Sequence, residues 1–346
     1  MKILIKSENK SYELSIGKYT SIISRDSSTS LNIINSLNSY FNEKRSDIDI
    51  INLETGDRLE KTNLKLIYFS NNEDYLEILK MTNKTSHLRK ILLSIIKNDK
   101  EMQETMLTAN SLLEDLIYSK KIEDFLNVNF SEKFQIDFKP LTEEDIVKVF
   151  EFNLLDNYIS GLEKKKIIFN ILSNSSNIVK EKTEYIYLFN QPEENLSYLE
   201  KINYIKFLKE LSKDNYVMVY TNDSIFISLE KYHKINFIEK KIVIDDDLII
   251  SMIDDFPVYI ENKQEEYVMK IKYYIIKYMQ IIMSKPVLTN IINHNSYYQN
   301  TLYFDNLENL SIVALILDYL KLGFSIDIKE ENTPFHHYLK NKSRQI

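Results

Sequence analysis

Residues 185–202, YIYLFNQPEENLSYLEKI, begin as an apolar run and end as a polar, helix-like segment. The run is rich in aromatic and β-branched residues, which favour a buried strand, and Pro192 marks a sharp turn at its end. A helical pattern over 195–211 is followed by a second strand-like run, YVMVYTND at 216–223. This strand–helix–strand order predicts parallel strands with a helix packed against them.

The N-terminal part of the chain repeats this layout. YTSIIS (19–24) has the pattern of a buried strand, and SLNIINSLNSYF (30–41) has apolar residues at helical spacing. Further short strands are predicted at KILIK, YELSI, DIDIINLE and LKLIYFS. We therefore predict an α/β fold with a mainly parallel sheet.

The pattern then changes twice along the chain. From about residue 72 it becomes helical, apart from a strand-like KFQIDF at 133–138, and beyond about 245 it becomes acidic and mostly helical, with a polar tail expected to be mobile. The predicted division is a head at 1–75 and 160–245, a helical insertion at 76–159 and a C-terminal extension at 246–346.

Composition restricts the chemistry. A length of 346 residues, 44% of them hydrophobic, allows a large core in two or three structural units. With Gly 4 and Cys 0, glycine-rich phosphate loops, disulfides and thiolate metal sites are not expected. The net charge of −7 means that any nucleic-acid contact must come from a local basic surface. The chain has no long apolar span and no signal peptide, so we expect a soluble protein of the cytoplasm.

The turn after the 19–24 strand resembles a phosphate-binding loop that has lost its chemistry. ABC-type ATPases carry G-x-x-x-x-G-K-[ST] at this place, whereas this chain has SRDSSTSL at 24–31, with no glycine and no lysine. Without them, the backbone cannot readily close around a phosphate, and its charge goes unmet. Two interpretations remain for this turn, helix capping or a weakly bound anion. The residues concerned are Ser27, Ser28, Thr29 and Ser30.

The stretch LFNQP resembles the strand-LLDEP segment of ABC-type ATPases with both acids replaced. Asn190 stands where an aspartate holds Mg²⁺, and Gln191 stands where a glutamate polarises water. A neutral amide cannot act as a general base and is a poor ligand for a divalent ion. The sequence therefore predicts a nucleotidase-like frame without hydrolysis, and so a protein that is not an enzyme.

Two weaker similarities follow the same order along the chain. ISGLEKKKIIFNIL (159–172) resembles the start of the LSGGQ helix, and Asn222 in VMVYTND stands where a histidine would sense the γ-phosphate. The alternative interpretation is a generic α/β protein in which LFNQP is only a strand followed by a turn.

Together these segments resemble the CRISPR-associated spacer-acquisition accessory proteins of type II-A loci, in their long form, which are inactive relatives of ABC and SMC ATPase heads. The resemblance covers residues 1 to about 245 and rests on GKYTSIISRDSSTSLNIINSL, LKLIYFS, FQIDF with LTEEDIVKVF, EYIYLFNQP and YVMVYTND. It implies a P-loop ATPase-like head in a homotetrameric ring. Such a ring would bind double-stranded DNA ends without sequence preference and assist the CRISPR integrase and effector nuclease complex.

The resemblance implies no required cofactor, with calcium as an optional one. Some members bind Ca²⁺ through acidic residues near the segment matching FQIDFKPLTEED, where only Asp137 keeps an acid in the strand. Glu143, Glu144 and Asp145 fit better as first-turn helix acids.

Two basic clusters are the candidate DNA contacts. A duplex backbone carries one negative charge per roughly 1.7 Å of axis, so a ring around it needs basic residues at intervals. The first cluster contains Lys80, Lys84, Arg89, Lys90, Lys97 and Lys100, and the second contains Lys164, Lys165 and Lys166. Both also fit ordinary solvated helix faces. The competing functions are an inert protein–protein scaffold that never binds DNA and a divergent nucleotide hydrolase.

Overall fold

A computed structural model of the protein describes residues 1–7, 10–24, 26–43, 46–61, 64–69, 81–82, 86–122, 124–125, 138–150, 160–178, 184–257, 264–283, 289–292, 301–304, 306–328 and 333–343. The chain forms two compact units. We call Met1–Asn71 with Thr183–Ile346 the sheet unit, and Asn72–Lys182 the helical unit.

A six-stranded sheet lies at the centre of the sheet unit, in the order β5-β6-β7-β3-β8-β9. Its strands are β3 (Tyr19–Ile23), β5 (Leu64–Phe69), β6 (Glu184–Asn190), β7 (Tyr216–Tyr220), β8 (His233–Phe237) and β9 (Ile242–Ile244). Neighbouring strands are parallel except β9, which pairs antiparallel with β8. The predicted α/β fold with a mainly parallel sheet is confirmed. The buried strands explain the nearly continuous apolar runs in the sequence.

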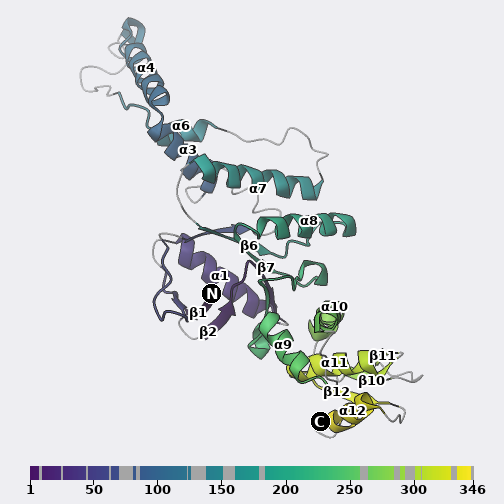
Figure 1. The fold of residues 1–346 in the computed structure, drawn as a ribbon. Helices are drawn as coiled ribbons and strands as arrows, with labels where there is room; N and C mark the ends of the chain where they lie inside the picture. The colour runs from purple at the N-terminus through teal and green to yellow at the C-terminus, as the bar shows by residue number, and fades with distance from the viewer. Residues whose placement is uncertain are drawn as a thin grey trace. The chain divides into compact units, whose positions relative to one another are not determined.

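Helices lie on both faces of this sheet (Figure 1). Helix α1 (Ser27–Asn42) packs on the face that carries Leu188 of β6. Helix α8 (Tyr198–Leu211) lies on the other face, where the Tyr204 ring meets the Phe189 ring edge to face. Successive residues of a strand point to opposite faces, so the neighbours Leu188 and Phe189 serve different helices.

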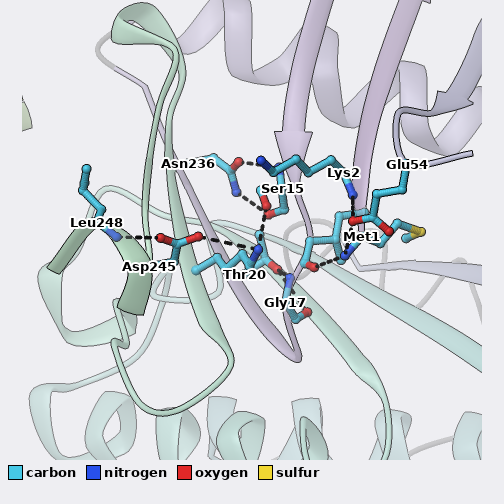
Figure 2. Close-up of polar contacts among 11 residues, drawn as sticks. Met1, Lys2, Ser15, Gly17, Thr20, Glu54, Asn236, Asp245 and Leu248 are labelled. Carbon is cyan, nitrogen blue, oxygen red and sulfur yellow. Dashed lines mark hydrogen bonds and ion pairs between the residues drawn. The ribbon is translucent and has the colours of Figure 1, made fainter. Parts of the chain in front are cut away.

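A smaller antiparallel sheet, in the order β2-β1-β4, joins the large sheet beside β8. It contains β1 (Lys2–Ser7), β2 (Lys10–Ser15) and β4 (Asp49–Asn52). The Ser15 N–H donates to Asn236 Oδ1 at 2.7 Å, and Asn236 Nδ2 donates to the Ser15 carbonyl at 2.9 Å (Figure 2). The buried amide of Asn236 therefore continues the strand pairing from one sheet to the other.

Two further contacts lie where the small sheet meets β8, one at Gly17 and one at Asp245 (Figure 2). Gly17 approaches the Tyr232 carbonyl so closely that a Cβ atom would lie 2.3 Å from that oxygen, so only glycine fits. Asp245 accepts a hydrogen bond from the Leu248 N–H at 3.2 Å, and its carboxylate lies 3.6 Å from Lys234 Nζ. Asp245 thereby caps the first helix of the C-terminal segment and ties that helix to β8.

The C-terminal segment packs on β8 through a shared core. Its helices are α9 (Asp246–Asp254), α10 (Gln264–Met283), α11 (Leu307–Tyr319) and α12 (Pro334–Ser343). A parallel sheet in the order β11-β10-β12 accompanies them, with β10 (Thr289–Ile292), β11 (Thr301–Tyr303) and β12 (Phe324–Asp327). Ile235 and Phe237 of β8 belong to the same hydrophobic cluster as Ile271 of α10. The expectation of a mobile tail is wrong up to Ser343, because α12 buries Leu339 completely.

The helical unit is built around one helix. Its described helices are α3 (His87–Asn98), α4 (Lys100–Ile117), α6 (Glu143–Val149) and α7 (Gly161–Ile178), and α3 packs against the other three. Compact packing thus places α7 in the helical unit and the C-terminal segment in the sheet unit. The three-part division drawn from the sequence stays a prediction about separate domains, and the strand expected at 133–138 lies outside the described residues, apart from Phe138.

Candidate functional site

Five parallel strands of the large sheet end at one edge, and four of them, β3, β6, β7 and β8, position the candidate residues. β3, β6, β7 and β8 are parallel, so their carboxyl ends lie at the same edge. Ile22 and Asn190 are both in register with Tyr220 of β7, which places their Cα atoms about 10 Å apart. After β3 the chain continues towards β5, at one side of the sheet. After β7 it crosses β3 and continues to β8, on the opposite side. Parallel sheets bind ligands where the connections reverse in this way.

The turn between β3 and α1 is closed by a helix cap. Asp26 accepts hydrogen bonds from the Ser28 N–H at 3.0 Å, the Ser28 hydroxyl at 2.8 Å and the Thr29 hydroxyl at 2.7 Å. The bond from Thr29, followed by those from Ser28, lowers the pKa of Asp26. Of the residues predicted here, Ser28 and Thr29 are donors in the cap, Ser27 begins the helix, and the capping residue itself is Asp26.

A second carboxylate reaches the same turn from the neighbouring strand. Directly after β8, residues Ile238–Lys240 form a short 3-10 helix, and Glu239 lies in this helix. One of its oxygens, Oε1, accepts from the Ser24 hydroxyl at 2.5 Å and from the Asp26 N–H at 3.0 Å. The hydroxyl and the backbone donor that begin this turn therefore already contact an anion that belongs to the chain.

The turn between β6 and α8 is less well satisfied. Asn190 is 8% exposed, and its Nδ2 donates to the Tyr68 hydroxyl at 3.2 Å. Its Oδ1 atom is buried without a hydrogen-bond partner among the described residues. Gln191 adopts a left-handed backbone conformation with φ 47°, which costs an L-residue about 1–2 kcal/mol. Its N–H donates to the Tyr220 carbonyl at 2.8 Å and extends the pairing of β6 with β7.

The acid of this turn is Glu193, which points back towards the end of β7. Its Oε1 accepts from the Asn222 N–H at 2.8 Å, whereas its Oε2 is buried without a partner in the described part of the chain. Burial raises the pKa of Glu193. Asn222 therefore contributes its backbone to this edge.

The donors and acceptors of this edge are largely used within the chain. The 24–31 turn offers no lysine, its leading donors contact Asp26 and Glu239, and Asn190 is neutral. No cluster of three or more His, Cys, Asp or Glu side chains suited to a metal occurs among the described residues. Asp137, the candidate calcium ligand, lies outside them. Asp145 forms a capping box with Thr142, in keeping with the first-turn interpretation.

The third similarity to an ATPase motif is a helix start in the helical unit. The Ser160 hydroxyl accepts from the Glu163 N–H at 3.2 Å, and the Glu163 carboxylate accepts from the Ser160 N–H at 3.1 Å. This reciprocal pair is a capping box, and local helix formation accounts for it.

The predicted basic clusters divide by exposure. Arg89 is 4% exposed and its guanidinium lies 3.0 Å from the Glu144 carboxylate, so it holds α3 to α6. Lys165 is 3% exposed. Both side chains are buried in this structure, and the assignment of the two clusters to DNA stays a prediction. Lys90, Lys97 and Lys100 are exposed and Lys164 and Lys166 are half-buried, while Lys80 and Lys84 lie outside the described residues.

Sequence reasoning missed Ser24, Asp26 and Glu239 at the first turn, and missed the direction of Glu193 at the second. Asp26 carried a usable signal, because an aspartate directly before a helical run is a common cap. Glu239 carried none, since 213 residues separate it from Asp26 and only the pairing of β8 with β3 brings them together.

The structure defines an α/β protein with a mainly parallel sheet, and the comparisons agree with that class. No protein-family model matches the chain, and a search of curated proteins found no match. The crystal structure of Stu0660 of Streptococcus thermophilus is similar over 99% of this chain and 99% of that chain, with a TM-score of 0.66 and 16% identity. At this identity the similarity shows a shared fold. Within the described residues, no helix combines the length and the hydropathy needed to span a membrane.

Proposed function

We propose that this protein binds the ends of double-stranded DNA without sequence preference, as a homotetrameric ring, and assists spacer acquisition in CRISPR immunity without hydrolysing ATP. The observation that carries the proposal is the edge of the large sheet. The β3–α1 and β6–α8 turns, which resemble nucleotide motifs, follow strands that are separated only by β7. Carboxylates of the chain itself contact the donors of the β3–α1 turn. A mainly parallel α/β sheet whose edge is filled in this way supports the proposal, because the resemblance implies an inactive ATPase-like head.

The exposed lysines of the helical unit are the candidate phosphate contacts. Lys90 and Lys97 lie on α3 and Lys100 begins α4, and all three are exposed. Lysine contacts to phosphate give affinity without sequence information, which suits binding to any duplex end. The ATPase-like head, the ring and the CRISPR partners follow from the resemblance alone.

Gel shifts with linear and relaxed circular duplexes test the proposal. We expect linear duplex of any sequence to bind and the circle, which has no end, to bind far less. Changing Lys90, Lys97 and Lys100 to Glu should weaken binding at least tenfold and flatten the dependence on salt, by about 0.9 in slope for each phosphate that is no longer neutralised. The matched control changes three exposed lysines of the sheet unit, Lys6, Lys206 and Lys231, to Glu. Equal weakening in both variants would remove the α3–α4 cluster from the proposal.

A second candidate function is an inert protein–protein scaffold, favoured by the net charge of −7 and by the burial of Arg89 and Lys165. Mass measurement in solution, with and without a short linear duplex, separates the two. A tetramer that gains mass with duplex supports the ring, whereas an unchanged mass together with absent gel shifts supports the scaffold.

A further inference from the structure

We propose that Glu239 is the residue that keeps phosphates out of the β3–α1 turn. This inference deepens the proposed function, since it rests on the interpretation of that turn as a former phosphate site. It assigns the exclusion of phosphate to one side chain, which lies just after β8. This adds to the effect of the glycines and the lysine that the turn lacks.

The contacts of Glu239 are those expected of a bound anion. Its Oε1 atom receives one hydroxyl and one backbone N–H, from Ser24 and Asp26, at the carboxyl end of a parallel strand and directly before a 16-residue helix. Backbone donors at the start of a helix favour negative charge, and oxygen anions are their usual ligands. Glu239 supplies such an oxygen from within the chain.

The turn keeps a further group of the right chemistry. Ser30, in the first turn of α1, is completely buried, and its hydroxyl has no hydrogen-bond partner among the described residues. An external phosphate would compete with Glu239 for Ser24 and for the Asp26 N–H. It would also meet the negative charges of Glu239 and Asp26 at short range, where like charges repel. Removing the Glu239 side chain relieves the competition and one of the two sources of this repulsion.

Pyrophosphate binding to the full chain, measured by calorimetry and by thermal shift, tests the role of Glu239. We expect Glu239→Ala to bind pyrophosphate at least tenfold more tightly than the unaltered protein. Glu43→Ala is the matched control, because Glu43 also accepts a serine hydroxyl, from Ser39 at 2.8 Å, but at the other end of the same helix. The control should bind like the unaltered protein. Adding Ser24→Ala to Glu239→Ala should remove most of the gain, which locates the site.

Glu239→Gln separates the effect of the negative charge from the effect of a side chain that fills the turn. It also replaces Glu239→Ala in the test if the alanine variant does not fold. It keeps an acceptor for Ser24 and removes the charge, so we expect a smaller gain of about threefold. If neither folded variant binds pyrophosphate more tightly than Glu43→Ala, the assignment to Glu239 is overturned. DNA binding is measured in parallel on the unaltered protein. A pyrophosphate gain without any DNA binding keeps the role of Glu239 and rejects the proposed function.

Discussion

The β3–α1 turn and the β6–α8 turn occupy the same edge of the same sheet, and they satisfy their polar groups in different ways. In the first turn, Asp26 and Glu239 accept hydrogen bonds from Ser24, Ser28, Thr29 and the local backbone. In the second, Asn190 Oδ1 and Glu193 Oε2 are buried without partners in the described part of the chain. In the first turn only the Ser30 hydroxyl is buried without a partner among the described residues, whereas the second turn combines a positive φ with two such oxygens.

The difference shows which turn satisfies its own polar groups more fully. Carboxylates that cap a helix stabilise it and need no ligand. Buried atoms without partners and residues with positive φ are costly, and they cluster at functional sites. Gln191 and Asn195 both have positive φ, so strain and unmet polarity coincide at the second turn. The second turn is therefore the place where a change of charge should alter stability most.

The largest expected effect comes from restoring an acid at the second turn. Asn190→Asp places a carboxylate at a position that is 8% exposed and near the Tyr68 hydroxyl. A buried charge with few donors is costly, so we expect the free energy of unfolding at pH 7 to fall by about 2 kcal/mol. Burial should raise the pKa of the new acid, and the destabilisation should shrink as the pH falls.

Urea unfolding at pH 7 and pH 5 measures this destabilisation. Asn35→Asp is the matched control, since Asn35 lies exposed on α1 and the same change there should have little effect. Equal stability of the two variants would mean that the second turn tolerates charge, and the contrast between the turns would disappear.

At the first turn the expected effect is smaller. It also shrinks as the pH falls, but at lower pH and because the unaltered protein, not the variant, changes its stability. Asp26→Ala removes the cap of α1 and should lower the midpoint of thermal unfolding by a few degrees at pH 7. The folded-state pKa of Asp26 is lowered, so its stabilising effect is present above its ordinary pKa of 3.8 and is lost as the pH falls through the lowered value. Thermal unfolding followed by circular dichroism from pH 7 to pH 2 should show the two proteins converging only in acid. Convergence already at pH 6 would contradict this account.

The sequence was sufficient where local pattern decides the structure. The helical pattern over 195–211 contains α8, and LKLIYFS and YVMVYTND contain β5 and β7. Neighbouring residues alone carry the helical periodicity and the apolar runs of strands buried on both faces. The order of the motifs also placed the two turns on one sheet, as the strand order shows.

The sequence was not sufficient where residues far apart in the chain contact each other. Arg89 looks like a surface cation in the sequence, but Glu144, 55 residues away, pairs with it inside the helical unit. The polar tail conceals Leu339, which is completely buried, and Phe335 and Tyr338 of the same helix pack beside it on the core. In each case the deciding partner is remote, and one sequence gives no measure of which remote residues meet.

Glu193 gives the smallest expected effect and the sharpest test of the contrast. Glu193→Gln keeps an acceptor for the Asn222 N–H and removes a buried charge whose Oε2 has no partner in the described structure, so the free energy of unfolding at pH 7 should rise by about 1 kcal/mol. Burial raises the folded-state pKa of Glu193, so the unaltered protein takes up a proton as the pH falls towards the ordinary value of 4.5, and the advantage of the variant should vanish there. Urea unfolding across pH 7 to 4.5 measures it, with the exposed Glu60→Gln as control. A variant that is less stable at pH 7 would show that the Glu193 charge is satisfied, and that both turns are equally complete.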